Sequence, residues 1–211
     1  YDSAAAVEDL EKFLTEKKIN AVVFGPGIGR EPVTGDILAM LLRFCDKNYI
    51  ERLLIDGDGL FALKQHLEHE SIPENLKNRI ALTPHFGEAS YLTGIDTSAL
   101  KKNHTWAASE ISNKINAVTL LKGPATVTTD GTQSYVNTTG TGAMATGGSG
   151  DVLSGICGAL MARGCETISA LAAGAFIHGL AGEKAAENCG KKLLRAGDIF
   201  QYIADALDSL D

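Results

Sequence analysis

The pattern with the clearest chemical meaning is the run Met-Ala-Thr-Gly-Gly-Ser-Gly-Asp, which ends at Asp151. Because glycine has no side chain, Gly147, Gly148 and Gly150 can bring consecutive backbone N–H groups close to one anion. Apolar residues recur at helical spacing over 152–161, so we expect the loop at a helix N-terminus, where the helix dipole favours negative charge. Asp151 would stand beside a bound phosphate and could accept the proton of an attacking hydroxyl. The run therefore predicts phosphoryl transfer; the alternative is a helix cap, since serine and aspartate are favoured at helix starts.

Composition limits the partners that the chain can have. Its 211 residues, 45% of them hydrophobic, predict one domain with one substantial core. The net charge of -7 and the lack of a basic run argue against nucleic acid. No apolar run reaches the length of a membrane span, and the four scattered cysteines predict neither disulfides nor a zinc site. We expect a cytoplasmic protein, not bound to a membrane, that acts on small molecules.

Strand and helix patterns alternate along the first half of the chain. Strands are expected near 21–24, 52–55, 79–82 and 118–121, and helices near 4–13, 36–44, 60–67, 87–92 and 109–115. This alternation predicts an α/β fold with a mostly parallel central sheet and helices on both faces. The turn pair Asp130-Gly131 favours a hairpin, so the sheet should end in an antiparallel edge. Beyond the glycine-rich run we expect helices near 167–186 and 196–207.

In open α/β sheets, ligands bind beyond the carboxyl ends of the strands. Four segments directly follow an expected strand and should meet at that edge: 25–29, 56–59, 83–88 and 122–126.

Six blocks, taken in order, resemble the ribokinase-like NAD(P)H-hydrate dehydratases, the carboxy-terminal catalytic domain of the YjeF family. The blocks are 25–29, 55–60, 82–88, 121–126, 144–151 and 175–182. The resemblance implies a ribokinase-like fold that repairs NADH hydrate and NADPH hydrate. ADP or ATP, with Mg²⁺, would phosphorylate the ring hydroxyl, and loss of phosphate would then restore NADH or NADPH.

The resemblance also implies a larger context. Members of the family commonly form homotetramers, and some are linked to an epimerase domain. The family's domain opens with a strand-helix-strand portion for which this sequence has no counterpart. We therefore expect residues 1–211 to form a single ribokinase-like catalytic domain that lacks this portion.

Single residues receive roles from the resemblance. Asp151 is expected to act as the base and, with Gly27 and His85, to contact the hydrated nucleotide. Gly148 and Gly150 are expected to stabilise charge on the transferred phosphoryl group. The residues implied to bind the donor nucleotide are Lys122, Gly123, Pro124, Ala125, Thr126, Gly147 and Gly150.

Other polar residues near these blocks have less specific roles. Glu88 either caps the following helix or helps to hold Mg²⁺ through water. Strand alternation points Asp56 and Asp58 to different sides, so we expect no shared metal and a structural role for at most one of them. His178 lies in an apolar helical segment, where we expect a core or interface position rather than catalysis.

Two other functions remain open at this point. One is a ribokinase-like kinase for a small alcohol or vitamin precursor, since such kinases share a glycine-rich loop that ends in aspartate. The other is a noncatalytic fragment that serves as a nucleotide-binding or assembly module.

Overall fold

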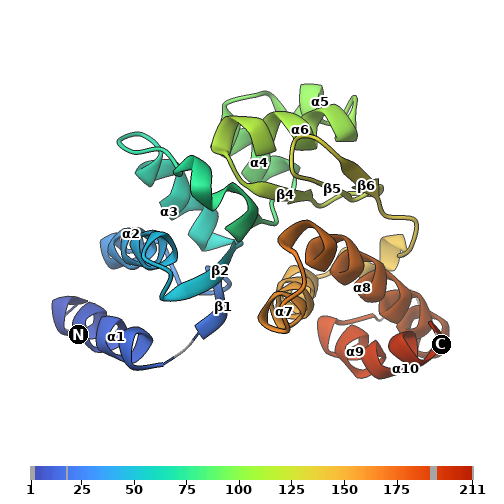
Figure 1. The fold of residues 1–211 in the computed structure, drawn as a ribbon. Helices are drawn as coiled ribbons and strands as arrows, with labels where there is room; N and C mark the ends of the chain where they lie inside the picture. The colour runs from blue at the N-terminus through green and yellow to red at the C-terminus, as the bar shows by residue number, and fades with distance from the viewer. Residues whose placement is uncertain (1–2, 18, 191–193, 211) are drawn as a thin grey trace.

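The structure, a computed structural model, describes residues 3–17, 19–190 and 194–210. Its centre is a six-stranded sheet whose strands lie side by side in chain order (Figure 1). The strands are β1 (Ile19–Phe24), β2 (Ile50–Ile55), β3 (Ile80–Leu82), β4 (Val118–Leu121), β5 (Val127–Thr129) and β6 (Ser134–Val136). β1 to β4 are parallel, whereas β5 pairs antiparallel with both β4 and β6. The predicted parallel sheet with an antiparallel hairpin at one edge is confirmed.

Helices connect the strands and follow the last one. The described helices are α1 (Ser3–Glu16), α2 (Pro32–Asp46), α3 (Asp58–His66), α4 (Phe86–Thr93), α5 (Thr97–Leu100), α6 (His104–Ile115), α7 (Ser149–Ala162), α8 (Thr167–Cys189), α9 (Ala196–Gln201) and α10 (Ile203–Asp208), with 3-10 turns at Glu74–Arg79 and Gly142–Met144. None of the helices described is long and apolar enough to cross a membrane.

Both faces of the sheet are covered. On one face α2 packs on β2, and α6 packs on β4 and β5; on the other, α7 packs on β1 and β2, and α8 on the next three strands. Alternating side chains of β2 separate the two layers, because Leu53 and Ile55 join the core beneath α2 and α3 while Leu54 joins the core beneath α7 and α8. Burial on both faces explains why the central strands read as nearly continuous apolar runs.

The C-terminal segment differs from its prediction as one helix over 196–207. The helix breaks at Tyr202, whose N–H donates to the carbonyl of Ile199 in a tight turn, and α10 begins one residue later. Figure 1 shows α9 and α10 beside α8 near the C-terminus. Buried Ile199 and Ala206 belong to the small apolar core in which these helices meet α8. The sequence pattern captured this apolar face but not the break.

The carboxyl ends of the parallel strands meet at one edge, and hydrogen bonds extend the sheet pairing past the strand ends. The N–H of Asp56 donates to the carbonyl of Phe24 at 3.0 Å, and that of Lys122 donates to the carbonyl of Pro84 at 2.8 Å. Gly25 has a φ of +120°, and a β-carbon there would overlap the carbonyl oxygen of Asp56. Only glycine lets the loop after β1 lie against the loop after β2.

Candidate active site

The glycine-rich loop ends at the N-terminus of α7, as the sequence predicts. Gly148 immediately precedes the helix with a φ of +84°, a left-handed conformation that favours glycine. The helix begins at Ser149, three residues before the apolar run 152–161. The reason is that the N–H groups of Asp151 and Val152 already bond to the carbonyl of Gly148 at 3.1 and 3.2 Å. Gly150 and Asp151 therefore belong to the first helical turn.

Several N–H groups of this segment are available to an anion. Within the described part of the chain, the backbone N–H groups of Gly147, Gly148 and Gly150 donate no hydrogen bond. Such unpaired donors at the start of a 14-residue helix lie where the helix dipole is positive. The loop can therefore hold a phosphate through its backbone.

A cavity of about 640 Å³ lies beside this loop. Its walls come from the ends of β3 and β4, the segment that leads into α7, and the middle of α8. The lining residues are His85, Lys122, Gly123, Pro124, Thr126, Asn137, Thr139, Gly140, Thr141, Gly142, Met144, Ala145, Thr146, Ser149, Gly150, Leu153, Ala175, His178 and Gly179. This volume falls within the range of small-molecule sites.

The wall formed by α8 depends on close packing. A β-carbon on Gly179 would overlap Thr139, whose hydroxyl donates to the carbonyl of Phe176 at 2.9 Å. The side-chain amide of Asn137 donates to the carbonyl of Ala175 at 3.3 Å. These contacts hold the segment after β6 against α8 and shape the cavity between them.

Lys122, which lines the cavity, meets two carboxylates from the segments that follow β2 and β3. The Nζ of Lys122 lies 2.8 Å from Oδ1 of Asp56 and 3.8 Å from Oε2 of Glu88. The Oδ2 of Asp56 accepts a hydrogen bond of 2.7 Å from the hydroxyl of Ser154 in α7. A β-carbon on Gly150 would lie 3.3 Å from the Lys122 Nζ, so the ammonium faces the first turn of α7. One cation and the unpaired backbone donors of the first turn of α7 thus share one corner of the cavity.

His85 and Glu88 form a capping box at the start of α4. The Nδ1 of His85 accepts hydrogen bonds from the N–H groups of Gly87 and Glu88 at 2.9 and 3.1 Å, and Glu88 accepts one from the His85 N–H at 2.8 Å. With Nδ1 accepting, neutral His85 carries its proton on Nε2. The capping role considered for Glu88 is confirmed, and its other oxygen lies 3.6 Å from that nitrogen.

His178 is buried in the cavity wall, with 7% of its surface exposed. Its Nε2 lies 3.3 Å from the hydroxyl of Ser149 in the first turn of α7. Burial lowers the pKa of His178 to about 4, against the opposing effect of a hydrogen bond with the backbone of Ser149, and the charge of Lys122 lowers it further. The imidazole is therefore neutral at pH 7. The expectation of a buried histidine is confirmed, but the sequence did not place it at a cavity.

Residues 3–205 match the sequence model of the NAD(P)H-hydrate dehydratases. This chain belongs to that family. A bifunctional NAD(P)H-hydrate repair enzyme from Thermofilum pendens is 38% identical over 208 residues, which cover 97% of this chain and 38% of the relative. An ADP-dependent (S)-NAD(P)H-hydrate dehydratase from Neisseria meningitidis is 35% identical over 196 residues, covering 92% of this chain and 64% of the relative. The chain thus spans less than two thirds of the length of these relatives.

The fold is shared with a solved structure. The ADP/ATP-dependent NAD(P)H-hydrate dehydratase from Bacillus subtilis, crystallised with ATP and Mg²⁺, superposes with a TM-score of 0.78 at 23% identity. The alignment covers 95% of this chain and 72% of that one. The predicted ribokinase-like fold is therefore confirmed.

The family residues predicted from the sequence fall into two groups. Lys122, Gly123, Pro124, Thr126, Gly150 and His85 line the cavity. Gly27, Ala125, Gly147, Gly148 and Asp151 do not.

The residues outside the cavity lining have different surroundings. Asp151 is exposed in the first turn of α7, one residue after Gly150. Gly27 has a φ of +64° in the loop after β1 and has open space around its Cα. The carbonyl of Ala125 lies 3.2 Å from the Nδ1 of His104. These positions leave Asp151 and Gly27 accessible from solvent rather than from within the cavity.

The two carboxylates after β2 have separate partners, but not because of strand alternation, since β2 ends at Ile55 and Asp58 is already the first residue of α3. Asp58 accepts a hydrogen bond from the N–H of Gly29 at 3.1 Å and pairs with Arg30 at 2.8 Å, whereas Asp56 bonds to Lys122. No group of three or more His, Cys, Asp or Glu side chains suited to a metal occurs among the residues that the structure describes. The sequence missed the pairing of Asp56 with Lys122, because 66 residues separate them.

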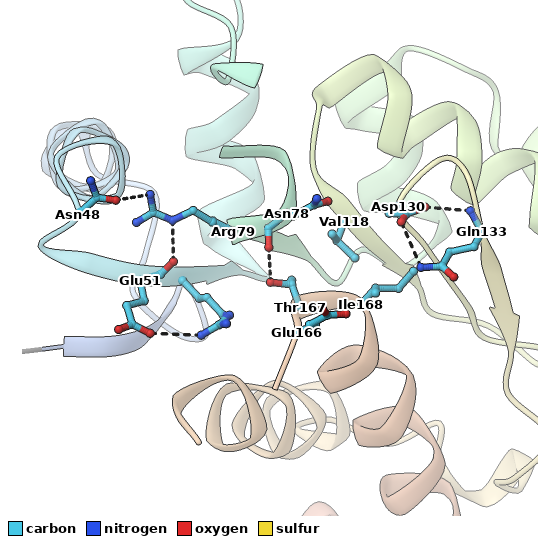
Figure 2. A pocket seen from close by; sticks show the side chains of 11 residues that line it. Asn48, Glu51, Asn78, Arg79, Val118, Asp130, Gln133, Glu166, Thr167 and Ile168 are labelled. Carbon is cyan, nitrogen blue, oxygen red and sulfur yellow. Dashed lines mark hydrogen bonds and ion pairs between the residues drawn. The ribbon is translucent and has the colours of Figure 1, made fainter. Parts of the chain in front are cut away.

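A second cavity, of about 630 Å³, lies at the amino ends of β2 to β4 (Figure 2). Its arginines already have partners. Arg79 donates to the carbonyls of Glu51 and Ile50 and to the side chain of Asn48 at 2.6 to 2.8 Å, as Figure 2 shows in part. Arg52 contacts Glu51 at 3.4 Å. These cations are engaged, and the cavity lies at the opposite ends of the strands from the glycine-rich loop.

Proposed function

We propose that this chain is a nucleotide-dependent NAD(P)H-hydrate dehydratase. ADP or ATP would phosphorylate the ring hydroxyl of NADH hydrate or NADPH hydrate, and the phosphate would then leave to restore NADH or NADPH. The observation that carries the proposal is the convergence of unpaired backbone donors at α7 with the Lys122 ammonium, at the mouth of a cavity, in a member of this family. Curated relatives named for this reaction support it.

The donor nucleotide would occupy the cavity beside α7. Its terminal phosphate would lie against the N–H groups of Gly147 and Gly150, with Lys122 balancing part of its charge. Residues 123–126 would flank the rest of the nucleotide. The cavity continues between the segment after β6 and α8, and its volume of about 640 Å³ has room for more of the nucleotide than its phosphates.

Asp151 would be the base. Its carboxylate would accept the proton of the ring hydroxyl as the hydroxyl oxygen attacks the terminal phosphorus of the donor, and the shortened nucleotide would leave. The phosphorylated ring carbon would next lose phosphate, and an adjacent carbon would lose a proton to form the restored double bond. The exposure of Asp151 beside Gly150 supports this role, since the hydrated nucleotide can reach this carboxylate from solvent. Gly27 and His85 would contact the same hydrated nucleotide.

Mg²⁺ fits this site as the partner of a bound nucleotide rather than as an ion held by protein alone. Magnesium commonly takes one or two carboxylates together with the phosphates of its substrate. Glu88, next to Lys122, is the carboxylate in position to contribute. The ion would offset the charge of the transferred phosphoryl group.

Turnover of hydrated NADH tests the proposal. We expect the absorbance of NADH at 340 nm to recover with Mg²⁺ and either ADP or ATP. The nucleotide that supports recovery is the donor. Asp151→Asn should keep nucleotide binding and lower kcat by about 100-fold or more, because a general base contributes that much. Asp205→Asn, another exposed carboxylate in the first turn of a helix, should retain full activity.

Other outcomes would redirect the assignment. Near-normal turnover by Asp151→Asn would remove that residue from the mechanism. Nucleotide binding without recovery of NADH would favour a small-alcohol kinase or a noncatalytic module.

The larger context is part of the proposal. We expect a homo-oligomer, a tetramer in the family's usual form, and an epimerase domain that is either linked to this chain or carried by a separate chain. Light scattering of the purified protein tests the first expectation. Epimerisation of the R form of hydrated NADH by the full-length protein tests the second.

A further inference from the structure

Asp56 is held more firmly than the other charged groups of the site. It follows β2, its N–H bonds to the carbonyl of Phe24, and its carbonyl accepts from the N–H of Gly59 at 3.0 Å. Only 2% of its surface is exposed. Its two carboxylate oxygens have different partners, the Lys122 ammonium at 2.8 Å and the Ser154 hydroxyl at 2.7 Å. One buried carboxylate therefore joins the end of β4 to α7.

Lys122 has few other constraints on its ammonium. Its backbone is fixed, but the side chain has four methylenes and rotates readily. The other carboxylate nearby, on Glu88, lies 3.8 Å away, beyond hydrogen-bonding distance. An ammonium has three N–H donors, and Asp56 takes one of them. The other two have no hydrogen-bond partner in the part of the chain that the structure describes, and they can meet a ligand at the first turn of α7, where a β-carbon on Gly150 would lie 3.3 Å away.

Ser154 adds a second constraint on the same corner. It lies four residues after Gly150, one helical turn along α7 and on the same side of the helix. Its bond to Asp56 fixes that side of the helix relative to the carboxylate that holds the lysine. The distance between the ammonium and the glycine-rich turn is thus set through Asp56.

We propose that Asp56 is a positioning residue for phosphoryl transfer: it fixes the Lys122 ammonium at the N-terminus of α7, so that lysine and backbone donors face the same transferred phosphoryl group. This proposal rests on the proposed function. Asp56 itself does not touch the phosphate, and its negative charge opposes the binding of one. Removing it should therefore harm the transfer step more than the binding of the donor.

A double-mutant cycle separates positioning from a purely structural role. We expect Asp56→Asn to lower kcat by roughly 10- to 100-fold, the cost of misplacing a catalytic group by about 1 Å, and to change the donor KM by less than about threefold. Asp56→Asn combined with Lys122→Met should have a kcat within about twofold of Lys122→Met alone, because Asp56 acts through the lysine. Glu51→Gln, which removes a carboxylate at the opposite end of β2, should leave both constants unchanged.

Chemical labelling of Lys122 gives a readout that does not depend on turnover. Acetic anhydride should label Lys122 at least about threefold faster in Asp56→Asn than in wild type, measured by peptide mass spectrometry. The ion pair of the wild type holds the nitrogen against the carboxylate and away from the reagent. If Asp56→Asn does not fold, Ser154→Ala takes its place, because it frees one carboxylate oxygen and keeps the charge. Ser154→Ala should lower kcat about threefold, and it should not lower kcat further when Lys122→Met is present.

The outcomes distinguish this proposal from the proposed function. If the two substitutions multiply their effects on kcat, Asp56 has only a structural role, and the dehydratase assignment stands. If hydrated NADH is not repaired by wild type, the assignment fails, and labelling alone decides the positioning role. Unchanged labelling of Lys122 in Asp56→Asn overturns the positioning role in either case.

Discussion

The burial of His178 predicts a loss of stability in mild acid. Unfolding returns its pKa from about 4 to the ordinary value of 6.5. Between these two values the unfolded chain binds a proton that the folded protein does not, so the free energy of unfolding falls as the pH falls through this window. The full difference is worth about 3 kcal/mol, and the part expressed between pH 7 and pH 5 is about 2 kcal/mol.

Urea denaturation followed by circular dichroism at pH 7 and pH 5 measures this loss. Carboxylates also change their protonation in acid, so the informative quantity is the difference between wild type and His178→Gln. Glutamine stays neutral and can still bond to Ser149. We expect wild type to lose about 2 kcal/mol more than His178→Gln between the two pH values. His69→Gln, at an exposed histidine, should keep the full pH dependence of wild type.

An equal loss in wild type and His178→Gln would refute this reasoning. It would mean that His178 is solvated in solution or binds its proton without strain. The wall of the cavity formed by α8 would then be open, and the close packing of the α7 N-terminus on α8 would be wrong.

Two further predictions concern glycine substitutions in α7 and the reactivity of the buried cysteines. Gly150→Ala should lower kcat at least about tenfold, because the new methyl group would lie 3.3 Å from the Lys122 Nζ, where phosphate is proposed to bind. The control is Gly155→Ala in the same helix, whose methyl group meets open space. It should keep full activity and raise the free energy of unfolding by about 0.5 to 1 kcal/mol. Burial raises the pKa of both Cys45 and Cys157 to about 12, so these thiols should resist iodoacetamide at pH 8 until urea unfolds the protein. The other two cysteines are exposed and should react in the folded state, and mass spectrometry of the alkylated peptides measures the difference.

The sheet was predictable because its determinants are local. Each parallel strand is a short apolar run, and the Asp130-Gly131 turn marks the change to antiparallel pairing. The edge at which the loops after the parallel strands meet followed from the strand ends alone. The start of α7 was not predictable from apolar periodicity, because Ser149, Gly150 and Asp151 are small or polar and contribute nothing to that pattern.

The charged corner of the site depends on the order of the strands rather than on any local pattern. Asp56 and Lys122 directly follow β2 and β4, and Glu88 lies in the first turn of α4 after β3; each alone resembles an ordinary surface or capping residue. They meet because β2, β3 and β4 are neighbours in the sheet. His178 was assigned to the core for a similar reason, since an apolar helix gives no sign that one of its faces borders a cavity.

The charges of this corner favour transfer over tight binding of the donor. Asp56 and Glu88 carry two negative charges against the single positive charge of Lys122, so the side chains alone repel a phosphate group. The attraction must come from the backbone donors at α7 and from a cation that arrives with the nucleotide. In the proposed reaction, the positioned ammonium contributes most in the transition state, when negative charge develops on the leaving oxygen and lies on the oxygens of the transferred phosphoryl group. This differential stabilisation raises kcat rather than affinity. We therefore expect kcat to fall in Asp56→Asn while the donor KM stays nearly constant.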